Sequence, residues 1–247
     1  MVGVKTRVIA LGDSITCGEG VGVRVHLAHT WAAVLAHALD AEFELLAQRG
    51  ARTSQMRAEQ LPIALRQRAP LATVLVGLND VSRTGWQPRQ VPLDLRATVA
   101  SLQAAGSTVL LARLHDPTLQ LPMPATIRRA ARDRIAVIND EVDALVRPGV
   151  LLLDLAAIPE LWRRSGWAVD RVHPSVLGHR AIAQAALGVL RREGWRTPEE
   201  VSLPSHWRQP GRLAEAAWLA RHGAPFLLRN ATKLAVPADR ERLVDVA

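Results

Sequence analysis

The chain has 247 residues, 49% of them hydrophobic and 22% charged, which is ordinary for one large globular domain and leaves enough apolar material for a core. Its formal net charge of +8 comes from scattered arginines, and the chain has no tyrosine and two phenylalanines for base stacking, so we expect no nucleic-acid binding. No apolar run approaches about 18 residues and no signal-peptide pattern opens the chain, so we expect no transmembrane segment and a cytoplasmic location.

Short apolar runs alternate with longer amphipathic stretches up to Trp195. The apolar runs, rich in Val, Ile and Leu, predict strands at residues 6–11, 42–46, 72–76, 107–114 and 149–155. The stretches between and after them have apolar residues at helical spacing and predict helices at 30–39, 54–69, 92–105, 124–147 and 174–192. Strands in which apolar and polar residues do not alternate, and which are separated by helices, are typical of a sheet that helices bury on both faces. We therefore predict an α/β fold, a three-layer α/β/α sandwich with a parallel, flavodoxin-like sheet of about five strands.

The pattern changes after Trp195. Residues 196–247 contain five prolines and no strand pattern, and their one clear amphipathic helix is predicted at 211–223. We therefore divide the chain into a core domain, residues 1–195, and a C-terminal helical extension, residues 196–247, that docks on the core. The apolar side chains expected to make this contact are Trp207, Trp218 and Leu219. A lid over a functional site and a contact between subunits are the alternatives for the extension.

Polar side chains and one glycine follow the predicted strands or precede the helix predicted at 174–192. They are, in chain order, Asp13, Ser14, Gly50, Asn79, Asp80, His115, Asp170 and His173. In open α/β sheets, ligands bind outside the carboxyl ends of the strands. We therefore expect these residues to converge on that edge of the sheet.

The types of these residues match the needs of acyl transfer. A serine hydroxyl such as that of Ser14 is a weak nucleophile and needs a neutral imidazole to take its proton. The imidazole in turn needs a carboxylate on its other nitrogen, and Asp170 lies three residues before His173, within reach through one turn. The oxyanion of a tetrahedral intermediate needs donors, for which the amides of Ser14 and Gly50 and the side-chain amide of Asn79 are candidates. Taken singly, each residue also has an ordinary explanation as a turn former or a helix cap.

Four short sequence blocks resemble those of the SGNH/GDSL hydrolases. They are "GDSIT" at 12–16, "RGA" around Gly50, "GLND" at 77–80 and "DRVHP" at 170–174, and the resemblance spans residues 8 to about 190. It implies an α/β/α fold and an ester-cleaving enzyme. It also implies that Ser14 is the nucleophile, that Asp170 and His173 complete the triad, and that Ser14, Gly50 and Asn79 form the oxyanion hole. Many members carry an asparagine several residues before this glycine, where the present chain has Leu45, Leu46 and Ala47, so local hydrogen bonding near Gly50 is expected to differ.

Other catalytic and cofactor motifs are incomplete. The nucleophile elbow of α/β-hydrolases would need a glycine at position 16, which is Thr16. A dinucleotide-binding loop built on "GEGVG" at 18–22 would need a glycine at position 23 or 25, and both are valine. The single cysteine, Cys17, excludes an internal disulfide framework and a multi-cysteine zinc site, and no His-Glu-x-x-His occurs. We therefore expect no metal and no cofactor.

The remaining polar residues receive structural roles. Cys17 is interpreted as a pocket or core thiol rather than a nucleophile, because no better base is assigned to it. Asp13 and Asp80 are expected to brace turns, His115 to line the pocket, and His179 to pack or cap on the helix predicted at 174–192.

The sequence therefore predicts a serine hydrolase that acts on a small-molecule ester through an acyl-enzyme. The acyl portion of the ester is expected to be small, for example an O-acetyl group on a sugar or metabolite. An acyltransferase that uses the same triad is one alternative. A catalytically silent binding or nucleic-acid-binding module is the alternative from another class.

Overall fold

The computed structural model describes residues 6–20, 23–121, 123–204, 211–223 and 225. Its main sheet contains five strands: β1 (Arg7–Gly12), β4 (Glu42–Leu45), β5 (Leu71–Leu75), β6 (Thr108–Arg113) and β7 (Val150–Asp154). The strand order is β4-β1-β5-β6-β7 and every neighbouring pair is parallel. This is the flavodoxin-like order, in which the connections switch direction between β1 and β5. The predicted parallel sheet is confirmed.

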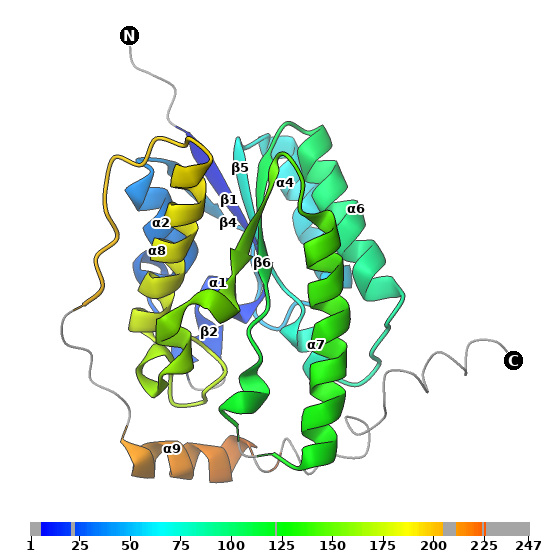
Figure 1. Ribbon diagram of the computed structural model, residues 1–247, viewed down its shortest axis with the longest axis vertical. Helices are drawn as coiled ribbons and strands as arrows, with labels where there is room; N and C mark the ends of the chain where they lie inside the picture. Colours follow the sequence, from blue (N-terminus) through cyan, green and yellow to red (C-terminus); the bar gives the residue numbers. More distant parts are fainter. Residues whose placement is uncertain (1–5, 21–22, 122, 205–210, 224, 226–247) are drawn as a thin grey trace, which may run out of the picture.

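Helices cover both faces of the sheet (Figure 1). On one face, α2 (Trp31–Ala38) packs against α8 (Val176–Arg192). On the other lie α4 (Leu61–Gln67), α6 (Gln90–Ala104) and α7 (Ala125–Leu145). The predicted three-layer α/β/α sandwich is therefore confirmed. Within the part of the chain that the model describes, no helix is both long enough and apolar enough to cross a membrane.

The core lies on both sides of the sheet because the strands carry apolar side chains on both faces. All five residues of β5 are buried, and the apolar residues of β1 and β6 are almost inaccessible to water. The two helices on one face are also joined by a polar contact, because Nδ1 of the buried His179 in α8 accepts a hydrogen bond from the Trp31 amide at the start of α2 (3.2 Å). His179 thus packs between helices and caps a helix start, as expected from the sequence.

The helix predicted at 54–69 is interrupted. It consists of α3 (Thr53–Gln55), a π-helical turn (Met56–Gln60) and α4. Pro62 has no amide hydrogen, so it cannot continue the regular hydrogen-bond ladder back to residue 58. In this turn the side chain of the buried Gln60 donates to the Gly12 carbonyl (2.9 Å) and accepts from the Gly12 amide (2.8 Å). The irregular turn therefore fixes the end of β1.

The first part of the C-terminal extension runs back over α2 and α8. The Glu199 amide donates to the Ala38 carbonyl (3.2 Å), and the Val201 carbonyl accepts from the Gln184 side chain (3.2 Å). Val201 itself is buried in the core. Further on, α9 (Arg212–Trp218) crosses the molecule below the carboxyl edge of the sheet (Figure 1). Trp207, which was expected to contact the core, lies outside the described residues.

Candidate active site

Ser14 lies directly after the first strand, at the start of a short helix. β1 ends at Gly12, whose φ of +144° is in the region that favours glycine and where a Cβ would lie 2.1 Å from the Leu75 carbonyl oxygen. Asp13 then caps α1 (Ser14–Cys17), since its Oδ1 accepts a hydrogen bond from the Ile15 amide (3.0 Å). This tight turn holds Ser14 at the carboxyl edge of β1, beside the point where the sheet order reverses.

A loop before α8 brings an imidazole and a carboxylate to Ser14. His173 Nε2 lies 2.9 Å from Ser14 Oγ, and His173 Nδ1 lies 2.5 Å from Asp170 Oδ2. The other oxygen of Asp170, Oδ1, accepts hydrogen bonds from the amides of Val172 and His173, both at 3.0 Å. Asp170 is only 2% exposed. The three side chains therefore form one hydrogen-bonded series, a geometry in which an imidazole held by a carboxylate can accept a proton from a serine hydroxyl.

A small hairpin that the sequence analysis missed packs against the imidazole. Its strands are β2 (Glu19–Gly20) and β3 (Val23–Arg24), each too short to show an alternating pattern. A Cβ on Gly20 would lie 2.4 Å from His173 Nδ1, so only glycine fits between the hairpin backbone and the ring. The signal in the sequence is the run of three glycines in "GEGVG", which by itself resembles part of a nucleotide-binding loop.

The three predicted oxyanion-hole residues lie close together. Asn79 is the second residue of α5 (Leu78–Ser82). Its Nδ2 donates a hydrogen bond to the Ala51 carbonyl (3.1 Å) and lies 3.5 Å from Asp13 Oδ2. These contacts join Asn79 to the neighbours in sequence of both Gly50 and Ser14. The Gly50 amide has no acceptor among the described residues, and the Ser14 amide, at the first position of α1, has none within its helix. The Ser14 and Gly50 amides can therefore donate to a substrate oxygen as they stand, whereas Asn79 Nδ2 would have to exchange its long contact with Asp13 for such an oxygen.

Two buried carboxyl groups lie behind the site. Burial raises the pKa of Asp13 to about 7, although the hydrogen bond from Ile15 and the charge of His173 act in the opposite direction. Burial also raises the pKa of Asp80, whose oxygens accept hydrogen bonds from the Thr53 amide and hydroxyl, both at 3.1 Å. Asp13 thus braces its turn, as expected from the sequence, whereas Asp80 joins α5 to the start of α3.

Cys17 lines an open cavity of about 880 Å³ on the side of α1 that faces the hairpin. The cavity is bounded by the hairpin, by the segment around His26 and by the segment after β4, and its lining includes Val25, Leu45 and Arg49. Burial raises the pKa of the Cys17 thiol, which keeps it protonated and a poor nucleophile at neutral pH. The expectation of a pocket thiol is confirmed.

His115 does not face an open pocket, contrary to the expectation from sequence. It is buried, and its ring stacks on Trp167 (centroids 5.3 Å apart) and meets the edge of Trp162 (5.2 Å). Burial accordingly lowers the pKa of His115. Because Trp162 is distant in sequence and carries no motif, its position over the end of β6 was not predictable.

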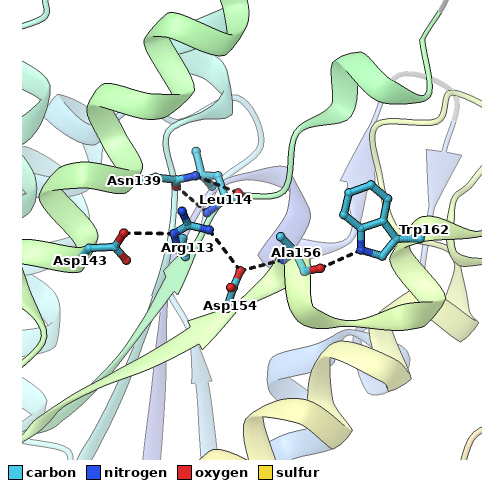
Figure 2. Close-up of polar contacts among 7 residues, drawn as sticks. All are labelled: Arg113, Leu114, Asn139, Asp143, Asp154, Ala156 and Trp162. Atoms are coloured by element: carbon cyan, nitrogen blue, oxygen red, sulfur yellow. Dashed lines mark hydrogen bonds and ion pairs between the residues drawn. The ribbon is translucent and has the colours of Figure 1, made fainter.

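Polar contacts at the ends of β6 and β7 reach Trp162 and the residue before His115, and Figure 2 shows these contacts. The Asn139 side chain from α7 pairs with both backbone groups of Leu114 (2.8 and 3.1 Å), the residue before His115. Asp154 Oδ1 accepts from the Ala156 amide (2.9 Å), and the Ala156 carbonyl accepts from Trp162 Nε1 (2.7 Å). The contacts therefore set the course of the loops that leave the carboxyl edge of the sheet.

The C-terminal helix α9 reaches the loop of Asp170 and His173. Glu215 of α9 is 3% exposed and forms ion pairs with Arg164 (2.6 Å) and with Arg171. Arg171 has a φ of +57° and also donates to the Gln120 carbonyl (3.2 Å). Burial disfavours the charge of Glu215, but the hydrogen bonds from Arg164 and Arg171 outweigh it and lower the pKa of Glu215. The sequence analysis expected apolar docking and missed this carboxylate, since a single glutamate on a helix has no distinguishing pattern.

No group of three or more His, Cys, Asp or Glu side chains in the described ranges is arranged to hold a metal ion.

Several known proteins are similar to this chain. A lipolytic protein of the G-D-S-L family from Desulfitobacterium hafniense has a TM-score of 0.61 at 18% identity, covering 74% of this chain and 99% of the other. An esterase, EstA, from Pseudoalteromonas sp. has a TM-score of 0.59 at 16% identity, covering 76% and 98%. An acetyl xylan esterase from Geobacillus stearothermophilus has a TM-score of 0.58 at 21% identity, covering 81% and 97%. At these identities the likeness establishes the fold.

A comparison with curated proteins found no match. The family assignment comes from a family model, described as the GDSL-like Lipase/Acylhydrolase family, which matches residues 10–181 and so includes all four sequence blocks. The match covers well over half of the chain and confirms the resemblance seen in the sequence. The protein therefore belongs to the GDSL-like lipase/acylhydrolase family and is a carboxylic ester hydrolase.

Proposed function

We propose that the protein hydrolyses a small-molecule ester through an acyl-enzyme formed on Ser14, with His173 and Asp170 as its base and orienting acid. The observation that carries the proposal is the series of contacts from Ser14 Oγ to His173 Nε2 (2.9 Å) and from His173 Nδ1 to Asp170 Oδ2 (2.5 Å). Asp170 already accepts two backbone hydrogen bonds on Oδ1, which keeps Oδ2 directed at the ring. This arrangement fixes the tautomer that leaves Nε2 free to accept the serine proton.

In the first half of the reaction, Ser14 Oγ attacks the carbonyl carbon of the ester while its proton passes to His173 Nε2. The carbonyl oxygen becomes an oxyanion, which accepts hydrogen bonds from the Ser14 and Gly50 amides and from Asn79 Nδ2. The intermediate then collapses, the bond between the carbonyl carbon and the alcohol oxygen breaks, and His173 returns its proton to the departing alcohol. The acyl group remains on Ser14.

In the second half, His173 Nε2 takes a proton from a water molecule, whose oxygen attacks the acyl carbon. The second oxyanion is held by the same donors, and its collapse breaks the bond to Ser14 Oγ, which recovers the proton from His173. The carboxylic acid leaves. Asp170 orients His173 and stabilises the imidazolium that forms in each half.

For the acyl group we propose a short chain such as acetyl. The similar solved structures include several of an acetyl xylan esterase, which supports a small acyl group. Initial rates on 4-nitrophenyl esters of graded length, together with acetylated sugars, test this point. The proposal predicts the highest kcat/KM for the acetyl ester and a decline beyond four carbons.

Two variants test the triad. Ser14→Ala and His173→Ala are expected to lower kcat by several orders of magnitude, and the double variant should be little worse than either single one, because the residues act as a unit. A fluorophosphonate probe should label the wild type on Ser14 and leave Ser14→Ala unlabelled. Near-wild-type turnover by folded Ser14→Ala would remove Ser14 from the mechanism. Product analysis with added alcohol distinguishes hydrolysis from acyl transfer.

A further inference from the structure

The guanidinium group of Arg83 lies against the backbone of Gly50. A Cβ built on Gly50 would lie 2.5 Å from Arg83 Nη2 and 3.4 Å from Cζ, so the absence of a side chain at Gly50 makes room for this cation. Gly50 has a φ of +78° and supplies one of the proposed oxyanion-hole amides. The cation therefore lies next to the place where the carbonyl of a bound ester is expected.

The backbone on both sides of Arg83 is held in place. Its amide donates to the Asn79 carbonyl (3.2 Å) four residues earlier, which puts Arg83 and Asn79 on one side of the turn that ends α5. The guanidinium of Arg52, two residues after Gly50, donates to the Thr84 carbonyl (2.7 Å). The segment that carries Arg83 is thus tied to the segment that carries Gly50, so ligand binding would need little reordering of the backbone.

The charge of Arg83 is not used inside the described part of the protein. Its side chain is exposed, and none of the described carboxylates forms an ion pair with it. The nearest buried carboxyl groups have other partners, since Asp80 accepts two hydrogen bonds from Thr53 and Asp13 caps α1. Arg49, the residue directly before Gly50 in the sequence, is also exposed and has no carboxylate partner in the described ranges.

We propose that Arg83 binds a carboxylate of the substrate, so that the preferred ester carries a negative charge close to the carbonyl that is attacked. A guanidinium presents paired N–H donors that match the two oxygens of a carboxylate, and its charge strengthens both bonds. The single charge of one carboxylate is balanced by the one guanidinium that contacts Gly50. The inference rests on the proposed function, because the site that Arg83 borders is the one assigned to ester cleavage. Arg83 then acts as a specificity residue and takes no part in the proton transfers.

Matched substrate pairs test this inference and locate the carboxylate. On the acyl side, 4-nitrophenyl hemisuccinate is compared with neutral 4-nitrophenyl pentanoate; on the alcohol side, 3-acetoxybenzoate is compared with 3-acetoxybenzamide. Relative to wild type, Arg83→Gln should lose about tenfold in kcat/KM on the charged member of one pair, mainly through KM, and change by less than about twofold on the neutral members. Arg83→Lys should restore part of the preference. Arg66→Gln, at an exposed arginine of α4 near the opposite edge of the sheet, is the control and should change neither.

Equal effects of Arg83→Gln on the charged and neutral members of both pairs would overturn the inference, as would a wild type that prefers neutral esters in both. Hydrolysis of the neutral esters that depends on Ser14 but not on Arg83 would leave the proposed function intact in that case. If Ser14→Ala hydrolyses every ester as fast as wild type, the proposed function fails and the inference fails with it.

Discussion

The ion pairs of Glu215 join the C-terminal helix α9 to the loop that carries Asp170 and His173. Glu215→Gln keeps the size of the side chain and removes its charge, which leaves Arg164 and Arg171 without their carboxylate. Removing one partner of a fully buried ion pair costs about 3–5 kcal/mol. The two arginine side chains are 32% and 24% exposed, so water screens part of this loss. We therefore expect the free energy of unfolding to fall by about 1–3 kcal/mol.

For a chain of 247 residues, whose entropy of unfolding is about 2.1 cal/mol/K per residue, that loss corresponds to a decrease in Tm of about 2–6 °C. The rate should change as well, because Arg171 lies between Asp170 and His173 and has a left-handed φ of +57° that its contacts must maintain. We expect kcat to fall severalfold at a temperature where the variant is still folded, with a smaller change in KM. Both quantities are measured on one preparation, by calorimetry and by ester hydrolysis.

Glu193→Gln is the matched control. Glu193 is exposed at the end of α8, and its substitution should shift the free energy of unfolding by less than about 0.5 kcal/mol and leave kcat unchanged. A double-mutant cycle with Arg171→Gln should show that the two effects do not add, because the two residues share one contact. An unchanged Tm and an unchanged kcat in Glu215→Gln would refute the reasoning, since they would mean that α9 does not hold the loop.

Asn79→Ala should lower kcat by about 10²–10³ with little change in KM or Tm, because its side-chain amide is proposed to bind the oxyanion; a lowered Tm with kcat within about threefold of wild type would assign Asn79 a structural role only. Gly20→Ala should reduce kcat at least tenfold because its Cβ would displace the His173 ring. Gly188→Ala should not, because its Cβ would make only an ordinary van der Waals contact with the Arg192 side chain (3.7 Å); equal rates in the two variants would contradict the packing. Burial lowers the pKa of His179 from 6.5 to about 3, so the folded state binds fewer protons than the unfolded state between these pH values. The contribution of His179 to the free energy of unfolding is therefore fully present above pH 6.5 and is lost as the pH falls toward 3. This loss is about 3 kcal/mol at pH 4, and urea titrations at pH 7 and 4 should show a smaller loss for His179→Asn; an identical loss would rule out His179 as its source.

Strand positions and the order of the catalytic blocks were readable from the sequence because they depend on local patterns. Five apolar runs predicted five strands whose ends lie within about two residues of those observed. The rule that ligands bind at the carboxyl edge of a parallel sheet then brought Ser14, Gly50, Asn79, Asp170 and His173 to one place. In the structure these five residues do lie together, although their catalytic roles remain proposals. The family resemblance followed from the same blocks, because their residue types and their order are specific to the family. The apolar strands between them occur in many folds.

Only the tertiary structure decided which distant residues support that edge. Gly20 was not identified as a neighbour of the His173 ring, and Gln60 was not identified as the partner of Gly12, because each contact joins segments that lie far apart in the sequence. The interruption of the helix at 54–69 and the short β2–β3 hairpin have too few residues for periodicity to detect. Glu215 and Arg83 appear in the sequence as ordinary surface charges. Their partners, Arg171 and the backbone of Gly50, are determined by how the loops at the carboxyl edge pack against one another, and a linear pattern carries no record of that packing.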